Sequence, residues 1–86
     1  MAARVVMYRT KFCGYCMLAK RLLVKKGVPF EEIDVSGDAE RRAWLLQVTG
    51  LQTVPQIFIG ERPIGGYLEL HLLERAGKLD ALLAGE

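Results

Sequence analysis

The chain has 86 residues, of which 51% are hydrophobic and 26% are charged. This length predicts one domain spanning residues 1–86, and the composition is ordinary for a globular protein. The net charge of +2 is small, and the basic residues are scattered at helix spacing, so we expect no nucleic-acid partner.

The first ten residues, MAARVVMYRT, have neither the long apolar core nor the small-residue cleavage site of a secretory signal. No apolar run in the chain approaches the ~18 residues of a membrane span. We therefore expect a cytoplasmic protein without membrane contacts, in a compartment that keeps thiols reduced.

A short apolar run at residues 4–8 predicts a buried strand, and RTKFCG then interrupts the pattern. From there on, apolar residues recur at the spacing of one helix face: Tyr15, Leu18, Ala19, Leu22 and Leu23. Lys25 and Lys26 complement the C-terminal end of this helix dipole, and Gly27 is the expected cap.

The next segment, VPFEEIDV, alternates apolar and acidic residues toward its end, which predicts a half-buried strand within 28–35. Ser36 and Asp38 are candidate caps for a helix over residues 39–48 that stops at Gly50. The buried face of this helix is expected to consist of Trp44, Leu45 and Val48.

Two more strands are predicted at residues 56–59 and 62–64, and the short turn between them requires an antiparallel pair. A third helix is expected over residues 67–76, before Gly77. Three leucines at i, i+3, i+4 spacing then predict a short helix docked on the core: Leu79, Leu82 and Leu83.

The predicted order is β-α-β-α-β-β-α followed by a short C-terminal helix. Strands that alternate with helices favour parallel pairing, whereas the last two strands pair antiparallel. The expected fold is therefore α/β, with a four-stranded mixed sheet flanked by helices on both faces.

The only two cysteines, Cys13 and Cys16, stand between the first strand and the first helix. The positive end of the helix dipole favours a thiolate there, so Cys13 is a candidate nucleophile and Cys16 its resolving thiol. Lys11 and Arg9 add positive charge nearby. Zinc needs about four ligands, and His71 is the only histidine. A redox pair is favoured over a zinc site and over two inert core cysteines.

Four motifs match one known family: CGYC at 13–16, TVPQIFIG at 53–60, IGG at 64–66, and LLERAGKLDALL near the end. With them, the chain resembles a dithiol glutaredoxin over essentially its whole length. The resemblance implies a thioredoxin-like fold, in agreement with the predicted element order. It also implies a glutathione-dependent oxidoreductase whose partners are glutathione and proteins that carry mixed or internal disulfides.

The resemblance further assigns roles to residues. Cys13 attacks and Cys16 resolves, while a cis Pro55 turns the backbone before it toward bound glutathione. The γ-glutamyl carboxylate is expected at the amides that begin the third helix, and basic side chains at the glycyl carboxylate. The residues expected to bind glutathione are Lys11, Tyr15, Arg42, Thr53, Val54, Pro55, Gly66, Tyr67 and Leu68.

The chain departs from the family pattern at three positions. Thr10 stands where many members have a lysine. Leu68 replaces the first of two acids, the one that meets the glutamyl ammonium, and Glu69 keeps the second. Gly14 replaces a common proline and restores a backbone N–H.

Some family members with a small residue at the position of Gly14 hold a 2Fe–2S cluster between two subunits. One alternative is therefore a dimeric cluster carrier or sensor, ligated by Cys13 and glutathione. Another is a redoxin that takes electrons from a different reductant. The chain is expected to be a monomer unless it binds such a cluster.

Overall fold

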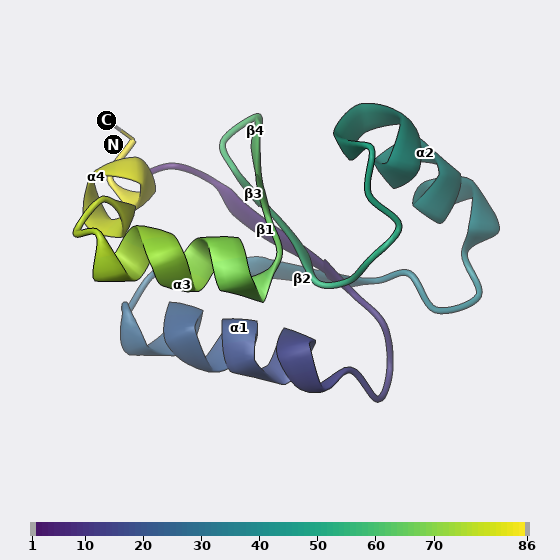
Figure 1. Ribbon diagram of the computed structural model, residues 1–86, viewed down its shortest axis with the longest axis horizontal. Helices are drawn as coiled ribbons and strands as arrows, with labels where there is room; N and C mark the ends of the chain where they lie inside the picture. Colours follow the sequence, from purple (N-terminus) through teal and green to yellow (C-terminus); the bar gives the residue numbers. More distant parts are fainter. Residues whose placement is uncertain (1, 86) are drawn as a thin grey trace.

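The computed structural model describes residues 2–85 and contains the eight elements predicted from the sequence, in the predicted order (Figure 1). They are β1 (Val5–Arg9), α1 (Gly14–Lys25), β2 (Glu31–Asp34), α2 (Ala39–Thr49), β3 (Gln56–Ile59), β4 (Arg62–Gly65), α3 (Tyr67–Arg75) and α4 (Leu79–Leu83). None of the helices in this range is long and apolar enough to cross a membrane.

The four strands form one mixed sheet in the order β2-β1-β3-β4. Strand β1 pairs parallel with β2 and antiparallel with β3, and β3 pairs antiparallel with β4. The predicted mixed sheet is confirmed. The C-terminal ends of β1 and β2 and the start of β3 lie at the same end of the sheet.

Helices cover both faces of the sheet, as predicted. Val5 and Met7 of β1 point into a core built with α1, α3 and α4, whereas Val6 and Tyr8 point into a smaller one beneath α2. Figure 1 shows α1 and α3 side by side, with α2 apart from them. Each fully buried apolar side chain, such as Leu70 in α3, contributes about 1.5–3 kcal/mol.

The predicted buried face of α2 is wrong at two of its three residues. Leu45 is buried, but Trp44 is 41% exposed and Val48 is 47% exposed. One helix alone covers this face, so a narrow row of side chains reaches the sheet. Trp44 lies beside that row, with its ring 5.8 Å from Tyr8 and 6.0 Å from Phe58.

The face predicted for α1 is also only partly buried. Ala19 and Leu23 are buried, but Tyr15 is 66% exposed and Leu18 is 38% exposed. Tyr15 lies on the side of the first turn of α1 that points away from the core. This side of the turn faces the loop before β3 and the start of α3, so its apolar residues border a surface site.

The two candidate caps of α2 have different roles. Asp38 is the N-cap and accepts a hydrogen bond from the Arg41 backbone N–H at 2.9 Å. Gly50 ends the helix in the left-handed conformation, with φ of 75°. Ser36 is not a cap: its hydroxyl accepts from the Lys11 backbone N–H at 2.8 Å and so holds the loop that leads to Cys13.

Candidate active site

Cys13 and Cys16 lie at the N-terminus of α1 and are joined by a disulfide, with their Cα atoms 5.2 Å apart. Cys13 is the N-cap residue, and its Sγ accepts a hydrogen bond from the Cys16 backbone N–H at 3.1 Å. This location confirms the helix start predicted for the pair. After reduction, the N–H and the positive end of the helix both favour a thiolate on Cys13.

The two sulfurs differ in accessibility. Cys16 is 1% exposed, whereas Cys13 is half-buried. Cys16 lies on the side of α1 that faces the core. A sulfur on another molecule can therefore approach Cys13 but not Cys16.

The loop before β3 faces the cysteine pair. The peptide bond between Val54 and Pro55 is cis, which confirms the prediction from the TVP motif. The Val54 carbonyl oxygen lies 3.8 Å from Cys13 Sγ. The backbone before Pro55 therefore lies beside the reactive sulfur.

A groove of about 360 Å³ runs from the first turn of α1 to the first turn of α3. Seven of the nine residues predicted to bind glutathione line it, together with one that was not predicted, Glu69. The seven are Tyr15, Thr53, Val54, Pro55, Gly66, Tyr67 and Leu68. The groove therefore brings together segments that are far apart in the sequence.

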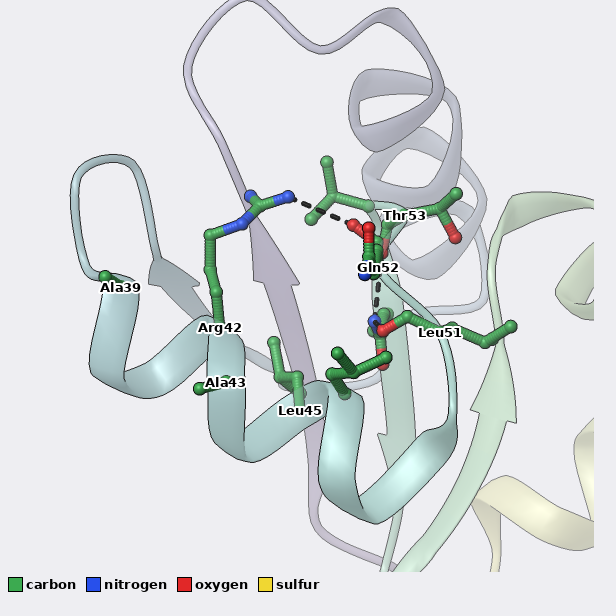
Figure 2. A pocket seen from close by; sticks show the side chains of 10 residues that line it. Ala39, Arg42, Ala43, Leu45, Leu51, Gln52 and Thr53 are labelled. Carbon is green, nitrogen blue, oxygen red and sulfur yellow. Dashed lines mark hydrogen bonds between the residues drawn. The ribbon is translucent and has the colours of Figure 1, made fainter.

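The two basic residues of the predicted set, Arg42 and Lys11, do not line this groove. Arg42 lines a neighbouring pocket of about 350 Å³ between α2 and the loop, which shares Thr53 and Val54 with the groove. Figure 2 shows Arg42 extending from α2 to the Gln52 carbonyl oxygen, to which it donates a hydrogen bond at 3.0 Å. Lys11 is exposed on the loop before Cys13.

Aromatic rings from two helices stack along one wall of the groove. The Tyr15 and Tyr67 ring centroids are 6.5 Å apart, and those of Tyr67 and His71 are 5.7 Å apart, each pair inclined by 30°. The role of His71 was not predicted. Its spacing of four residues from Tyr67 is the helical signal that could have revealed the contact.

The start of α3 is capped by its own acid. Glu69 Oε1 accepts a hydrogen bond from the Gly66 backbone N–H at 2.6 Å. A Cβ on Gly65 would lie 2.7 Å from that oxygen, and the φ of 115° at Gly65 is a conformation that favours glycine. The Tyr67 and Leu68 amides begin the helix and have no intrahelical partner. Glu69 was missed as a site residue, although its place three residues after the cap is a capping signal.

Gln56 stabilises the loop before β3, and this role was not predicted from the sequence. Its side chain is 3% exposed and accepts from the Thr49 hydroxyl at 2.8 Å. Its amide group donates to the carbonyl oxygens of Leu51 at 2.9 Å and Thr53 at 3.0 Å. One buried side chain thus fixes the loop backbone that faces Cys13.

The charges around the cysteines are arranged differently from expectation. Arg9 is paired with Glu32 at 3.1 Å, so the positive charge expected from it is largely offset. Hydrogen bonds from the Ser36 hydroxyl and N–H, then the charges of Lys11 and Arg9, hold the pKa of Asp34 below its ordinary value. Among residues 2–85, no group of three or more His, Cys, Asp or Glu side chains could hold a metal ion.

Comparisons with known proteins agree with this geometry. Residues 5–64 match the family model described as Glutaredoxin. A Pseudomonas aeruginosa protein named glutaredoxin is 58% identical over 80 residues, covering 93% of this chain and 95% of that protein. Escherichia coli glutaredoxin 3 is 44% identical, covering 94% and 98%.

Solved structures are similar over nearly the whole chain. Glutaredoxin from Brucella melitensis has a TM-score of 0.88 at 45% identity, covering 99% of this chain and 94% of that one. A buckwheat glutaredoxin–glutathione complex has a TM-score of 0.88 at 34% identity, covering 94% and 76%.

Proposed function

The chain belongs to the glutaredoxin family and is a thiol–disulfide oxidoreductase with a thioredoxin-like fold, and we propose that glutathione is its reductant. The observation that carries the proposal is the groove beside Cys13, whose walls are the cis-proline loop and the start of α3. The buckwheat relative, solved with glutathione, supports it.

The groove suits a short extended peptide with a free carboxylate. In our proposal, the backbone of the tripeptide pairs with Val54, next to the sulfur of Cys13. Its γ-glutamyl carboxylate binds the first amides of α3, at Tyr67 and Leu68, where the helix dipole favours an anion. Tyr15 packs against the peptide on the open side, where it is 66% exposed.

The proposed reaction is two successive thiol–disulfide exchanges. The Cys13 thiolate attacks the glutathione sulfur of a protein–glutathione disulfide, and the protein leaves as a thiolate that takes a proton from water. A second glutathione thiolate then attacks the Cys13-bound glutathione, which releases oxidised glutathione and restores the Cys13 thiolate. The cycle consumes two glutathione equivalents, one of them from the substrate, and suits a reducing cytoplasm.

Protein disulfides require the second cysteine. Once Cys13 is bonded to a substrate sulfur, Cys16 attacks Cys13, forms the disulfide seen in this structure, and releases the substrate as a thiol. Two glutathione molecules then reduce the Cys13–Cys16 disulfide. Burial of Cys16 keeps it from attacking other molecules, which supports this order of steps.

Serine substitutions test the proposed roles. Cys13→Ser should abolish release of glutathione from a glutathionylated protein, because no sulfur remains within reach of the substrate. Cys16→Ser should keep much of that activity and lose reduction of protein disulfides. Both are measured by coupling to glutathione reductase and NADPH, and equal loss in both variants would contradict the monothiol route.

Two alternatives have separate tests. Faster turnover with thioredoxin reductase than with glutathione and glutathione reductase would identify a different reductant. A 2Fe–2S cluster would need thiolate donors from outside one chain, because Cys16 is buried and Cys13 is the one accessible cysteine of residues 2–85. Anaerobic reconstitution with glutathione distinguishes a brown dimer from a colourless monomer.

A further inference from the structure

Phe12, directly before Cys13, combines a left-handed backbone with a fully exposed side chain. Its φ is 56°, and within residues 2–85 it is the one residue other than glycine with positive φ. Its side chain is 103% exposed, so it packs against nothing in the free protein. A large apolar residue is unfavourable in this conformation. Neither local preference nor packing therefore accounts for phenylalanine here.

Phe12 stands where it could pack against the first turns of α1, but it does not make this contact. In a hydrophobic staple, the residue before the N-cap packs against the fourth residue of the helix, which here is Met17. Met17 is 53% exposed and Phe12 is entirely exposed, so this contact is not made. The ring is thus available to another molecule beside the reactive cysteine.

The backbone on both sides of Phe12 is held in place. Lys11 donates its N–H to the Ser36 hydroxyl at 2.8 Å, and the Arg9 carbonyl oxygen accepts from Val35 at 2.8 Å. On the other side, Cys13 is fixed as the N-cap of α1. The ring is therefore presented by an ordered loop.

Chemistry at Cys13 brings the substrate chain next to this ring. In a mixed disulfide, the Cα atoms of the two bonded cysteines lie about 4.4–6.8 Å apart. The Phe12 Cα is about 3.8 Å from the Cys13 Cα. Residues that flank a substrate cysteine on the Phe12 side of Cys13 therefore come within reach of the ring.

Glutathione would use a different side of Cys13. The residues lining the groove come from the first turn of α1, the cis-proline loop and the start of α3, and Phe12 is not among them. Glutathione also has no apolar side chain on either side of its cysteine. A contact at Phe12 would therefore distinguish among polypeptides and leave the exchange with glutathione unaffected.

We propose that Phe12 is a docking contact for polypeptide substrates and receives an apolar side chain that flanks the substrate's disulfide-bonded cysteine. The proposal rests on the proposed function, in that Cys13 is the sulfur that bonds to the substrate. Burial of one apolar side chain against the ring removes apolar area from water on both partners. The site thereby selects substrates whose cysteines have apolar neighbours, as in unfolded segments.

The test uses two symmetric peptide disulfides, in which Cys13 bonds directly to the peptide cysteine, together with the mixed disulfide of glutathione with 2-mercaptoethanol. The two peptides differ at one residue, which is leucine or serine beside the cysteine. For the wild-type chain, kcat/KM should be about five- to tenfold higher for the leucine peptide. Phe12→Ala and Phe12→Gly should both reduce this ratio to about one, whereas Phe12→Trp should keep it. Rates on the small disulfide should stay unchanged in all three variants.

A matched control is Val24→Ala, which removes a 61% exposed apolar side chain from the last turn of α1 and should change neither the peptide preference nor the rate on the small disulfide. An unchanged peptide preference in Phe12→Ala and Phe12→Gly would overturn the proposal. Retention of the preference by glycine but not alanine would assign the effect to the backbone, and would also overturn it. A self-association that Phe12→Ala abolishes would identify a second copy as the occupant instead. In each case, the cysteine variants above test the proposed function separately.

Discussion

The two sulfurs at the start of α1 have opposite surroundings, and this difference determines the order in which they react. Cys13 is accessible and accepts the Cys16 N–H, so its thiolate is stabilised where a substrate can reach it. Cys16 is buried and can attack only a disulfide already formed on Cys13. Cys16 is therefore placed to resolve a disulfide on Cys13, and its burial protects it from reaction with other molecules.

The Asp34 carboxylate connects the loop before Cys13 to the end of β2, and it predicts a pH dependence of stability. Its pKa is lowered in the folded state, chiefly by hydrogen bonds from Ser36. The stabilisation is therefore present above the ordinary value of 3.8 and is lost as pH falls through the lower folded value. Asp34→Asn should be less stable than the wild type at pH 7, with the difference shrinking toward pH 3.

Thermal unfolding of both proteins across this range measures the effect. The difference in stability between the wild type and Ser36→Ala should shrink in the same way as pH falls. Part of it should remain at low pH, because this substitution also removes the acceptor for the Lys11 N–H. A difference between the wild type and Asp34→Asn that stays constant from pH 7 to pH 3 would rule out this account.

The loop before β3 is an element without regular structure, and its order depends on one buried amide. Gln56→Leu would leave the carbonyl oxygens of Leu51 and Thr53 without their donor. We expect a loss of about 1–3 kcal/mol in the free energy of unfolding. Because the loop forms a wall of the groove, the KM for glutathione should rise more than kcat falls.

Gln52→Leu is the matched control, since Gln52 is exposed in the same loop and, within residues 2–85, only its backbone oxygen is hydrogen-bonded. Its stability and KM should stay close to wild type. If the two variants behave alike, Gln56 is not the residue that holds the loop.

The first turn of α3 depends on a glycine. Gly65 has φ of 115°, and an added Cβ would meet the Glu69 carboxylate that caps the helix. Gly65→Ala should therefore destabilise the fold by more than about 1 kcal/mol and disturb the groove. Gly14→Ala provides the comparison, because a Cβ there meets nothing within 4 Å and should cost little stability. Denaturant unfolding of both variants measures the difference.

How far the elements could be predicted depends on the range of the interactions that define them. Strand β1 and the cysteine helix follow from local periodicity, and the cis Pro55 from a motif. The exposure of Trp44 could not be predicted, because it depends on α2 being alone on its face of the sheet. Gln56 could not be recognised either, since its partners are backbone oxygens whose positions only the folded loop defines.

At the scale of the whole molecule, α1 and α3 run side by side with their N-termini at the active site (Figure 1). Cys13 caps one helix and Gly66 caps the other, so both positive helix ends face the groove. A thiolate and a carboxylate can therefore be stabilised at neighbouring helix starts. The spacing of these two helices determines the width of the groove.

Lys26 joins the opposite ends of these helices, and its removal should loosen the whole arrangement. It follows α1 and contacts Asp80 of α4 at 2.7 Å and Glu74 of α3 at 2.8 Å, with its side chain 14% exposed. The bonds to Asp80, then Glu74, raise the pKa of Lys26 above its ordinary 10.5. This stabilisation is complete below pH 10.5 and is lost as pH rises through the higher folded value.

Lys26→Met should lower the melting temperature at pH 7 and abolish that alkaline loss of stability. Lys25→Met, at an exposed neighbouring position, should do neither. Equal melting temperatures for the two variants at pH 7 would show that α1, α3 and α4 are held by apolar packing alone.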